Sequence, residues 1–564
     1  MHSIEAVLTL LLAVAASGYL VWALPFSLPL PLVQIGLGAL IAGVLHRGHA
    51  LEPELFFLLF LPPLLFLDGW RIPKQGLVRD RRAILQLALG LVVFTVVGAG
   101  YLIHWMIPTM PLALAFALAA VVSPTDPVAV SGIATRTTIP PRLKHILEGE
   151  SLLNDASGLV CFQFAVAAVL TGGFSLRAAG ISFLWVAGVG LACGVLAVRL
   201  INLAQDWIWR RIGDEVGPAI LVNLLTPFAA YLLAEGLQAS GILAAVAAGI
   251  TMSFIELSGK ATGNLRVQRA AIWDMVQFSF NGIMFVLLGE QLPGIWSAAL
   301  QSLPASGRSS PWWLLAYALA LSAGLMLLRF VWVWVSLHGV SLLQRLRGRP
   351  VLLPPWQIVL ATALAGVRGA ITLAGVLTLP LALPDGSPLP ARALVVFLAA
   401  AVILISLAVA TVALPRLLQG LQLREESSEQ LQEELARQQS AKAALAAIEA
   451  LRLRLVEEAA SGQADAAPVP PARAAAVYNE AAARIALRYQ HIVQRGGTAG
   501  SGEGEENALQ DLQRLEQALQ QLRQAGLAAE RSELFRLARR GKISDALSRR
   551  LVRDLDLLDS REQR

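Results

Sequence analysis

Long apolar runs recur along the chain and set its organisation. We count thirteen of them, near residues 4–24, 27–46, 54–70, 83–104, 111–133, 146–170, 178–199, 217–236, 239–255, 271–292, 312–337, 355–378 and 393–415. A helix needs roughly 20 apolar residues to cross a bilayer, so each run predicts one membrane-spanning helix. We number these spans 1–13 in chain order. The predicted fold class is an all-α polytopic membrane protein with about 13 transmembrane helices.

The pattern changes after residue 415, where Gln, Glu, Ala, Leu and Arg become frequent. Apolar residues at helical spacing predict helices near 422–459, 474–493, 507–540 and 543–558. A proline-containing linker at 461–473 and a Gly- and Glu-rich linker at 496–506 separate them. We therefore expect a membrane domain over 1–415 and a helical cytoplasmic tail with a regulatory role over 416–564.

The composition favours the membrane interpretation. The chain is 56% hydrophobic and only 15% charged, whereas soluble domains carry roughly 25% charged residues. Its formal net charge of +6 is explained by basic loops between the spans, so nucleic acid is not an expected partner. Two cysteines, both inside apolar runs, give no basis for a disulfide framework or a metal motif.

The basic residues in the loops predict the orientation. With the N-terminus outside, the inside loops carry seventeen Lys and Arg residues and the outside loops carry four. Basic residues concentrate in cytoplasmic loops. We therefore expect a multi-pass protein of the cell (inner) membrane, with its N-terminus outside and its tail in the cytoplasm.

Two spans contain interruptions. Span 5 has prolines on both sides of Thr125-Asp126, and span 12 contains Gly366-Val367-Arg368-Gly369. Prolines break helices, and interrupted spans at matching places in two halves are typical of a transporter's midplane site. We predict that spans 1–6 and 8–13 are inverted repeats whose two discontinuous helices cross. Asp126 would then compensate helix N-termini and Arg368 helix C-termini.

Span 6 carries the chemistry. Ser151 and Asp155 are four residues apart and share a helix face, as do Glu150 and Asn154. Hard cations require oxygen ligands, and Asp155, Ser151 and a freed backbone carbonyl of Thr125 would supply them to Na⁺. Because Asp155 can hold either a cation or a proton, the expected function is cation/proton exchange. Charged groups are not buried singly, so we expect Arg329 in span 11 to pair with Glu150.

Other classes of protein fit less well. An ion channel also needs buried polar residues, but paired broken helices favour alternating access over an open pore. An intramembrane enzyme needs a dyad such as Ser-His, and no histidine lies deep in a span near Ser151. We therefore expect no enzymatic activity and no cofactor. The residues leave the cation open: K⁺/H⁺ or Ca²⁺/H⁺ exchange remains an alternative to Na⁺/H⁺ or Li⁺/H⁺ exchange.

At these residues the sequence resembles the bacterial NhaP-type sodium–proton antiporters of the monovalent cation:proton antiporter-1 family, relatives of the animal sodium–proton exchangers. The resemblance covers about 4–415. The matching motifs are Leu61 to Phe66, Ser123 to Pro127, Gly149 to Asp155, Asn281 with Phe285 to Gly289, Arg329, and Gly366 to Thr372.

The resemblance implies a homodimer in the lipid membrane, with a six-helix core in each protomer that moves like an elevator. It implies pH homeostasis through electroneutral exchange, because the family's Asn-Asp pair stands here as Asn154-Asp155. It assigns ion coordination to Thr125, Ser151 and Asp155. The pairing of Glu150 with Arg329 and the helix-end roles of Asp126 and Arg368 have the same basis.

The sequence departs from the family pattern in span 3. Many relatives carry an acidic residue directly after the Leu-Pro-Pro run, where this chain has Leu67, and its carboxylate is Asp68. One residue turns a side chain by about 100° around a helix. We therefore expect Asp68 at the entrance rather than at the ion. A helix-end carboxylate near Arg71 is the alternative.

Overall fold

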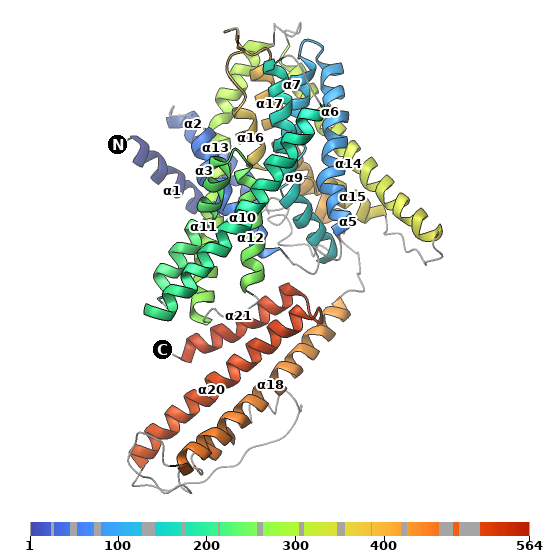
Figure 1. The fold of residues 1–564 in the computed structure, drawn as a ribbon. Coiled ribbons are helices and arrows are strands. Elements are labelled where there is room, and N and C mark those ends of the chain that lie inside the picture. The colour runs from blue at the N-terminus through green and yellow to red at the C-terminus, as the bar shows by residue number, and fades with distance from the viewer. Residues whose placement is uncertain are drawn as a thin grey trace. The chain divides into compact units, whose positions relative to one another are not determined.

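The computed structural model describes residues 2–23, 28–45, 53–72, 81–126, 141–171, 176–212, 215–256, 263–303, 310–346, 356–384, 386–418, 426–461, 476, 478–483, 485 and 508–562 (Figure 1). In these ranges the regular elements are helical, apart from one isolated bridge between Ala382 and Pro388. The chain forms two compact units. Unit 1 comprises Met1–Ser253 and Ala271–Leu421, and unit 2 comprises Phe254–Ala270 and Gln422–Arg564.

Most of the helices belong to unit 1. They are α1 (His2–Ala23), α2 (Leu30–Leu45), α3 (Pro53–Arg71), α5 (Arg81–Leu85), η1 (Gln86–Leu91), α6 (Val92–Met106), α7 (Leu112–Val122), α9 (Pro141–Thr171), α10 (Leu176–Ile212), α11 (Val216–Gly236), α12 (Gly241–Glu256), α13 (Gly263–Ser302), α14 (Trp312–Leu346), α15 (Trp356–Leu364), α16 (Ala370–Leu377) and α17 (Arg392–Leu418). The last residues of α12 and the first of α13 fall in unit 2.

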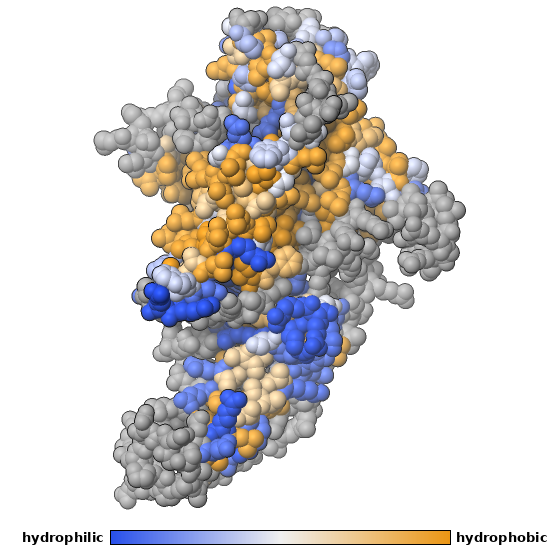
Figure 2. All heavy atoms as spheres, viewed as in Figure 1, coloured by the Kyte–Doolittle hydropathy of each residue, from blue (hydrophilic) through white to orange (hydrophobic). Residues whose placement is uncertain are grey.

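Eight helical stretches in the described ranges are long and apolar enough to cross a membrane. They are Glu5–Ala23, Ala83–Met106, Leu143–Thr171, Leu184–Arg211, Val216–Gly236, Gly263–Ser302, Trp312–His338 and Arg392–Leu418. Apolar side chains cover much of the visible face of unit 1 (Figure 2). Trp22 is 93% exposed and Trp105 78%, as expected of residues that face lipid. A helical membrane protein is thus confirmed, while the count of thirteen spans stays a prediction.

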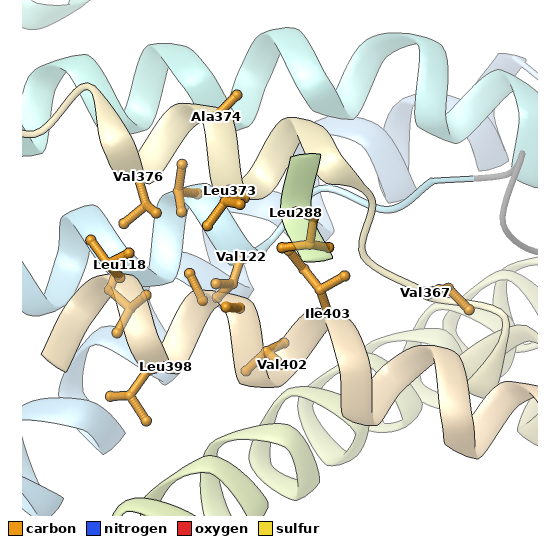
Figure 3. Close-up of a cluster of buried hydrophobic side chains, with 14 of the residues drawn as sticks. Leu118, Val122, Leu288, Val367, Leu373, Ala374, Val376, Leu398, Val402 and Ile403 are labelled. Carbon is orange, nitrogen blue, oxygen red and sulfur yellow. The ribbon is translucent and has the colours of Figure 1, made fainter. Parts of the chain in front are cut away.

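The core of unit 1 surrounds α7, which contacts α6, α9, α16 and α17. The sequence of α7 is apolar on every side, a pattern typical of a fully buried helix. Figure 3 shows its Leu118 and Val122 against Leu373 and Val376 of α16 and Ile403 of α17. This packing holds the end of α7 in a fixed position, and the candidate site begins there.

Helix α3 is placed by close backbone contact with α12. A Cβ atom on Gly249 would collide with the carbonyl oxygen of Phe66, and one on Gly69 would lie 2.6 Å from the carbonyl oxygen of Val246. Small residues allow membrane helices to approach this closely. The contact constrains the rotation of α3, the helix that carries Asp68.

A π-helical turn, η1, lies between α5 and α6. The side-chain hydroxyl of Ser157 on α9 donates to the carbonyl oxygen of Ala88 in this turn at 2.7 Å. The indole of Trp332 on α14 donates to the carbonyl oxygen of Gln86 at 3.2 Å. The turn is therefore hydrogen-bonded both to the helix that bears the candidate ion ligands and to α14.

Unit 2 contains α18 (Glu426–Ser461), α20 (Ala508–Arg539) and α21 (Asp545–Glu562), close to the helices predicted near 422–459, 507–540 and 543–558. Of the helix predicted near 474–493, only 476, 478–483 and 485 are described. Gly541 ends α20 with a φ of +73°, the left-handed geometry that favours glycine at a helix C-terminus. Leu534, Leu547 and Leu551 lie in the shared core of α20 and α21.

Candidate cation-binding site

Two helix interruptions meet in unit 1. α7 ends at Val122 and Ser123–Asp126 are not helical, because Pro124 has no backbone N–H with which to continue the helical hydrogen bonds. The second half of the predicted span 5 lies outside the described residues. Span 12 is interrupted between α15 and α16, and Figure 3 shows Val367 on this non-helical stretch. The backbone N–H of Asp126 donates to the carbonyl oxygen of Val367 at 2.7 Å, so the two interruptions are in direct contact.

Arg368 lies at the C-terminal ends of two helices. Its Nε donates at 2.8 Å to the carbonyl oxygen of Val122, the last residue of α7. Its Nη1 donates to the carbonyl oxygen of Gly366, just after α15. The last carbonyls of a helix lack intrahelical partners and carry partial negative charge. The buried guanidinium therefore satisfies carbonyls from both interrupted spans.

Asp126 lies at the opposite kind of helix end. Gly369 is the N-cap of α16, and a Cβ atom there would collide with the Asp126 carboxylate. A carboxylate is favourable beside a helix N-terminus, where the helix carries partial positive charge. Glycine is needed at 369 because a side chain would displace this carboxylate.

The predicted ligands on α9 gather around Thr125. The hydroxyl of Ser151 donates to the carbonyl oxygen of Thr125 at 2.7 Å. The amide of Asn154 donates to the Thr125 hydroxyl at 3.0 Å, which donates in turn to Glu150 Oε1 at 3.4 Å. Asp155 is buried beside them. The structure thus brings Thr125, Ser151, Asn154 and Asp155 together.

Glu150 and Arg329 form a buried bidentate ion pair. Arg329 Nη2 donates to Glu150 Oε2 at 2.7 Å, and Nη1 donates to Oε1. The remaining Nε donates to the carbonyl oxygen of Thr362 on α15 at 3.0 Å. The Arg329 side chain is 2% exposed and the Glu150 side chain 1%, so each buried charge is neutralised by the other. The pair joins α9, α14 and α15 next to the ligands.

A cavity of about 30 Å³ lies between these elements. Its walls are formed by Leu64, Leu65 and Asp68 of α3, by Pro124, Thr125 and Asp126, by Ser151 and Asp155 of α9, by Gln277, Asn281 and Met284 of α13, and by Gly369, Ile371 and Thr372. One water molecule occupies roughly 10–15 Å³ of such a cavity, so there is room for a small cation with little of its hydration shell. Hard cations prefer the carboxylate, hydroxyl and carbonyl oxygens found here.

Asp68 is part of the cavity wall together with Asp155. Its offset from the family position predicts a place at the entrance, and whether Asp68 reaches the ion stays a prediction. Arg71, named in the alternative, donates to two groups of α13: its Nη2 lies 2.5 Å from Asp274 Oδ1, and its Nη1 donates to Gln277 Oε1 at 2.6 Å.

Gln277 was not among the predicted site residues, and Asn281 was predicted only as part of a motif. Both line the cavity. They are four residues apart within an apolar run, which places them on one helix face. That signal was available, although polar residues at this spacing also occur in ordinary helix packing.

Comparison with known proteins decides the family. The family "Sodium/hydrogen exchanger, transmembrane" matches residues 10–420. The chain belongs to this sodium/hydrogen exchanger family. It is therefore a membrane transporter of the antiporter class and not an enzyme, and the resemblance seen in its motifs is confirmed.

Three relatives illustrate the match. The chain is 40% identical to "Uncharacterized Na(+)/H(+) exchanger YjcE" of Escherichia coli, covering 98% of each protein. It is 44% identical to a "Sodium, potassium, lithium and rubidium/H(+) antiporter" of Bacillus pumilus, covering 73% of this chain and 61% of that protein. Its fold is similar to that of the sodium proton antiporter MjNhaP1 of Methanocaldococcus jannaschii, with a TM-score of 0.54 at 18% identity, over 75% of this chain and 99% of that one.

Proposed function

We propose that this exchanger carries Na⁺ in exchange for H⁺, with Asp155 binding either the cation or the proton. The observation that supports this most directly is the small cavity where Asp155, Ser151 and Thr125 meet beside two helix interruptions. A carboxylate that holds one cargo at a time makes release of the proton a condition for binding the cation. Li⁺ and K⁺ are alternative cargo, because their ligand preferences are the same.

We infer an alternating-access mechanism of the elevator type from the composition of the cavity walls. One wall belongs to α3 and α13, and the other to α9, α16 and the two interruptions. The second group is internally bonded through Asp126, Val367 and Arg368. It is therefore suited to move as a body past the first group and to expose the cargo to each side in turn.

Electroneutral exchange of one cation for one proton is part of the proposal, with Asp155 as the titrating group. Asp68 in the same cavity makes this testable. If Asp68 also released a proton in each cycle, transport would move net charge. Proteoliposomes clamped at different membrane potentials should therefore show the same Na⁺-driven proton flux, and a potential-dependent flux would contradict one-for-one exchange.

We also propose the homodimer, the inner-membrane location and the orientation with the N-terminus outside and the tail in the cytoplasm. The orientation rests on the basic residues of the loops, seventeen on the inside and four on the outside. The dimer rests on the family resemblance. Cysteines placed in successive loops and labelled from each side of the membrane test the orientation, and cross-linking in native membranes tests the dimer.

The decisive experiment for transport is proton flux in everted vesicles with an imposed pH gradient. Addition of Na⁺, Li⁺, K⁺ or Ca²⁺ in turn should dissipate the gradient in the wild type and rank the ions. Asp155→Asn should abolish the response. Glu215→Gln, at an exposed position before α11, is the control and should retain it. An inactive wild type over pH 6 to 9 would refute the function, and an active Asp155→Asn variant would refute the site.

A second candidate cargo has specific support. The Bacillus pumilus relative is named for sodium, potassium, lithium and rubidium, so K⁺/H⁺ exchange by the same cavity is the main alternative. The ion series above separates the two, because a Na⁺ exchanger should respond to K⁺ only at much higher concentration. Ca²⁺/H⁺ exchange and channel activity remain outcomes of the same experiment, channel activity being recognised by flux that does not saturate.

A further inference from the structure

A buried carboxylate of the tail lies between two arginines in unit 2. Asp556 of α21 accepts from Arg266 of α13, with Nε at 2.8 Å from Oδ2 and Nη2 at 2.7 Å from Oδ1. Arg531 of α20 places its Nε 2.8 Å from the same Oδ1. The Asp556 side chain is 2% exposed, and those of Arg266 and Arg531 are 10% and 15% exposed. We call these three residues the Asp556 node.

The residues around the Asp556 node pack closely against it. A Cβ atom on Gly263, the first residue of α13, would lie 2.8 Å from Asp556 Oδ1. The Arg266 guanidinium lies over the ring of Phe535, 5.8 Å from its centroid, within the range of a cation–π contact. Arg269 of α13 pairs with Glu256 at the end of α12. The tail therefore binds the start of α13 through buried, directional contacts.

Helix α13 continues from the node to the cation cavity. Eleven residues separate Arg266 from the cavity residue Gln277, which is about 16 Å of helix. Between them, Trp273 is fully buried and donates to Asn223 on α11 at 2.8 Å. Continuous helices transmit displacements along their axis. Helix α13 is therefore the element through which a change at Arg266 would act on Gln277 and Asn281.

We propose that the tail is an intramolecular brace for α13, attached through Asp556, and that transport at full rate requires this attachment. The proposal rests on the exchange function above for its transport readout. It gives the tail a defined binding partner, the first two turns of its own α13.

The test uses the full-length protein and a charge exchange. Asp556→Arg places three cations at the node and should detach the tail. Arg266→Asp combined with Asp556→Arg restores one carboxylate between two arginines. Asp554→Arg is the matched control, because Asp554 is exposed on the same helix. Each variant is examined by hydrogen exchange and by Na⁺-driven proton flux in proteoliposomes.

Hydrogen exchange reports docking without depending on transport. The amides of Val267 to Ala270 lie beyond the four unpaired N–H groups at the start of α13. In Asp556→Arg they should exchange at least about tenfold faster than in the wild type. The flux should fall about threefold or more. The paired exchange of charges should bring both readouts within about twofold of the wild type, and Asp554→Arg should change neither.

Three results would overturn the proposal. Unchanged hydrogen exchange in Asp556→Arg would show that the node does not hold α13. Faster exchange with unchanged or increased flux would show that the attachment does not support transport. Failure of the double variant to recover would show that the charge pairing is not the cause. A wild type without cation-driven flux would instead refute the proposed function, and hydrogen exchange would still decide docking.

Discussion

Replacing Arg329 with methionine should strongly destabilise unit 1. Methionine replaces the aliphatic part of the arginine side chain but removes both donors to Glu150 and the donor to the carbonyl oxygen of Thr362. It leaves the Glu150 carboxylate, 1% exposed, without its counter-ion. Breaking a buried ion pair by removing one partner costs about 3–5 kcal/mol.

Thermal unfolding of the detergent-solubilised protein, followed by tryptophan fluorescence, measures this cost. The entropy of unfolding is roughly 2.1 cal/mol/K per residue. For unit 1, a loss of about 3–5 kcal/mol therefore corresponds to a fall of about 4–6 °C in the unfolding midpoint. Arg71→Met is the control. Its pair with Asp274 is 39% and 50% exposed, and such a pair contributes only about 0–1 kcal/mol.

The double variant Glu150→Gln with Arg329→Met tests the physical reason. Removing both charges eliminates the unpaired buried carboxylate, so the double variant should unfold at a higher temperature than Arg329→Met alone. The reasoning is wrong if Arg329→Met shifts the midpoint no further than Arg71→Met. It is also wrong if the double variant is the least stable of the set, because the cost would then lie in lost packing.

Three further predictions concern transport in vesicles. Gly369→Ala should lower the flux about tenfold or more, because overpacking displaces the Asp126 carboxylate. The control Gly217→Ala places its methyl group in open space and should leave the flux unchanged. Equal fluxes in the two variants would contradict the packing argument. Ser151→Ala should raise the KM for Na⁺ about tenfold through loss of one hydroxyl ligand, and an unchanged KM would place the ion elsewhere. The KM for Na⁺ should rise as the pH falls, by up to about tenfold per pH unit, because the proton and the cation compete for Asp155; a KM independent of pH would exclude that competition.

The features that could be predicted from the sequence have local signals. Prolines around Thr125-Asp126 indicate a helix interruption without knowledge of the neighbours. Ser151 and Asp155 share a face because of helical spacing alone. Arg329 is conspicuous because an isolated charge in an apolar run needs a partner, and Glu150 was the available carboxylate.

The features that were missed depend on contacts between distant segments. One of them is the close backbone contact of Gly249 with Phe66, which constrains the rotation of α3, the helix that carries Asp68. The π-helical turn at Gln86–Leu91 has no proline or glycine pattern that identifies it. The attachment of Arg266 to Asp556, 290 residues away, has no local signal at either position.

The hydrogen bond between Asp126 and Val367 has a consequence for the energetics of the proposed exchange. It joins the two interruptions, and the Ser151 hydroxyl ties α9 to the same segment at Thr125. If this bonded group moves intact, the oxygens of Thr125, Ser151 and Asp155 keep their spacing whichever side the cavity faces. Their contribution to cation affinity is then the same on both sides, so the half-saturating cation concentration should not depend on the side from which the cation is added.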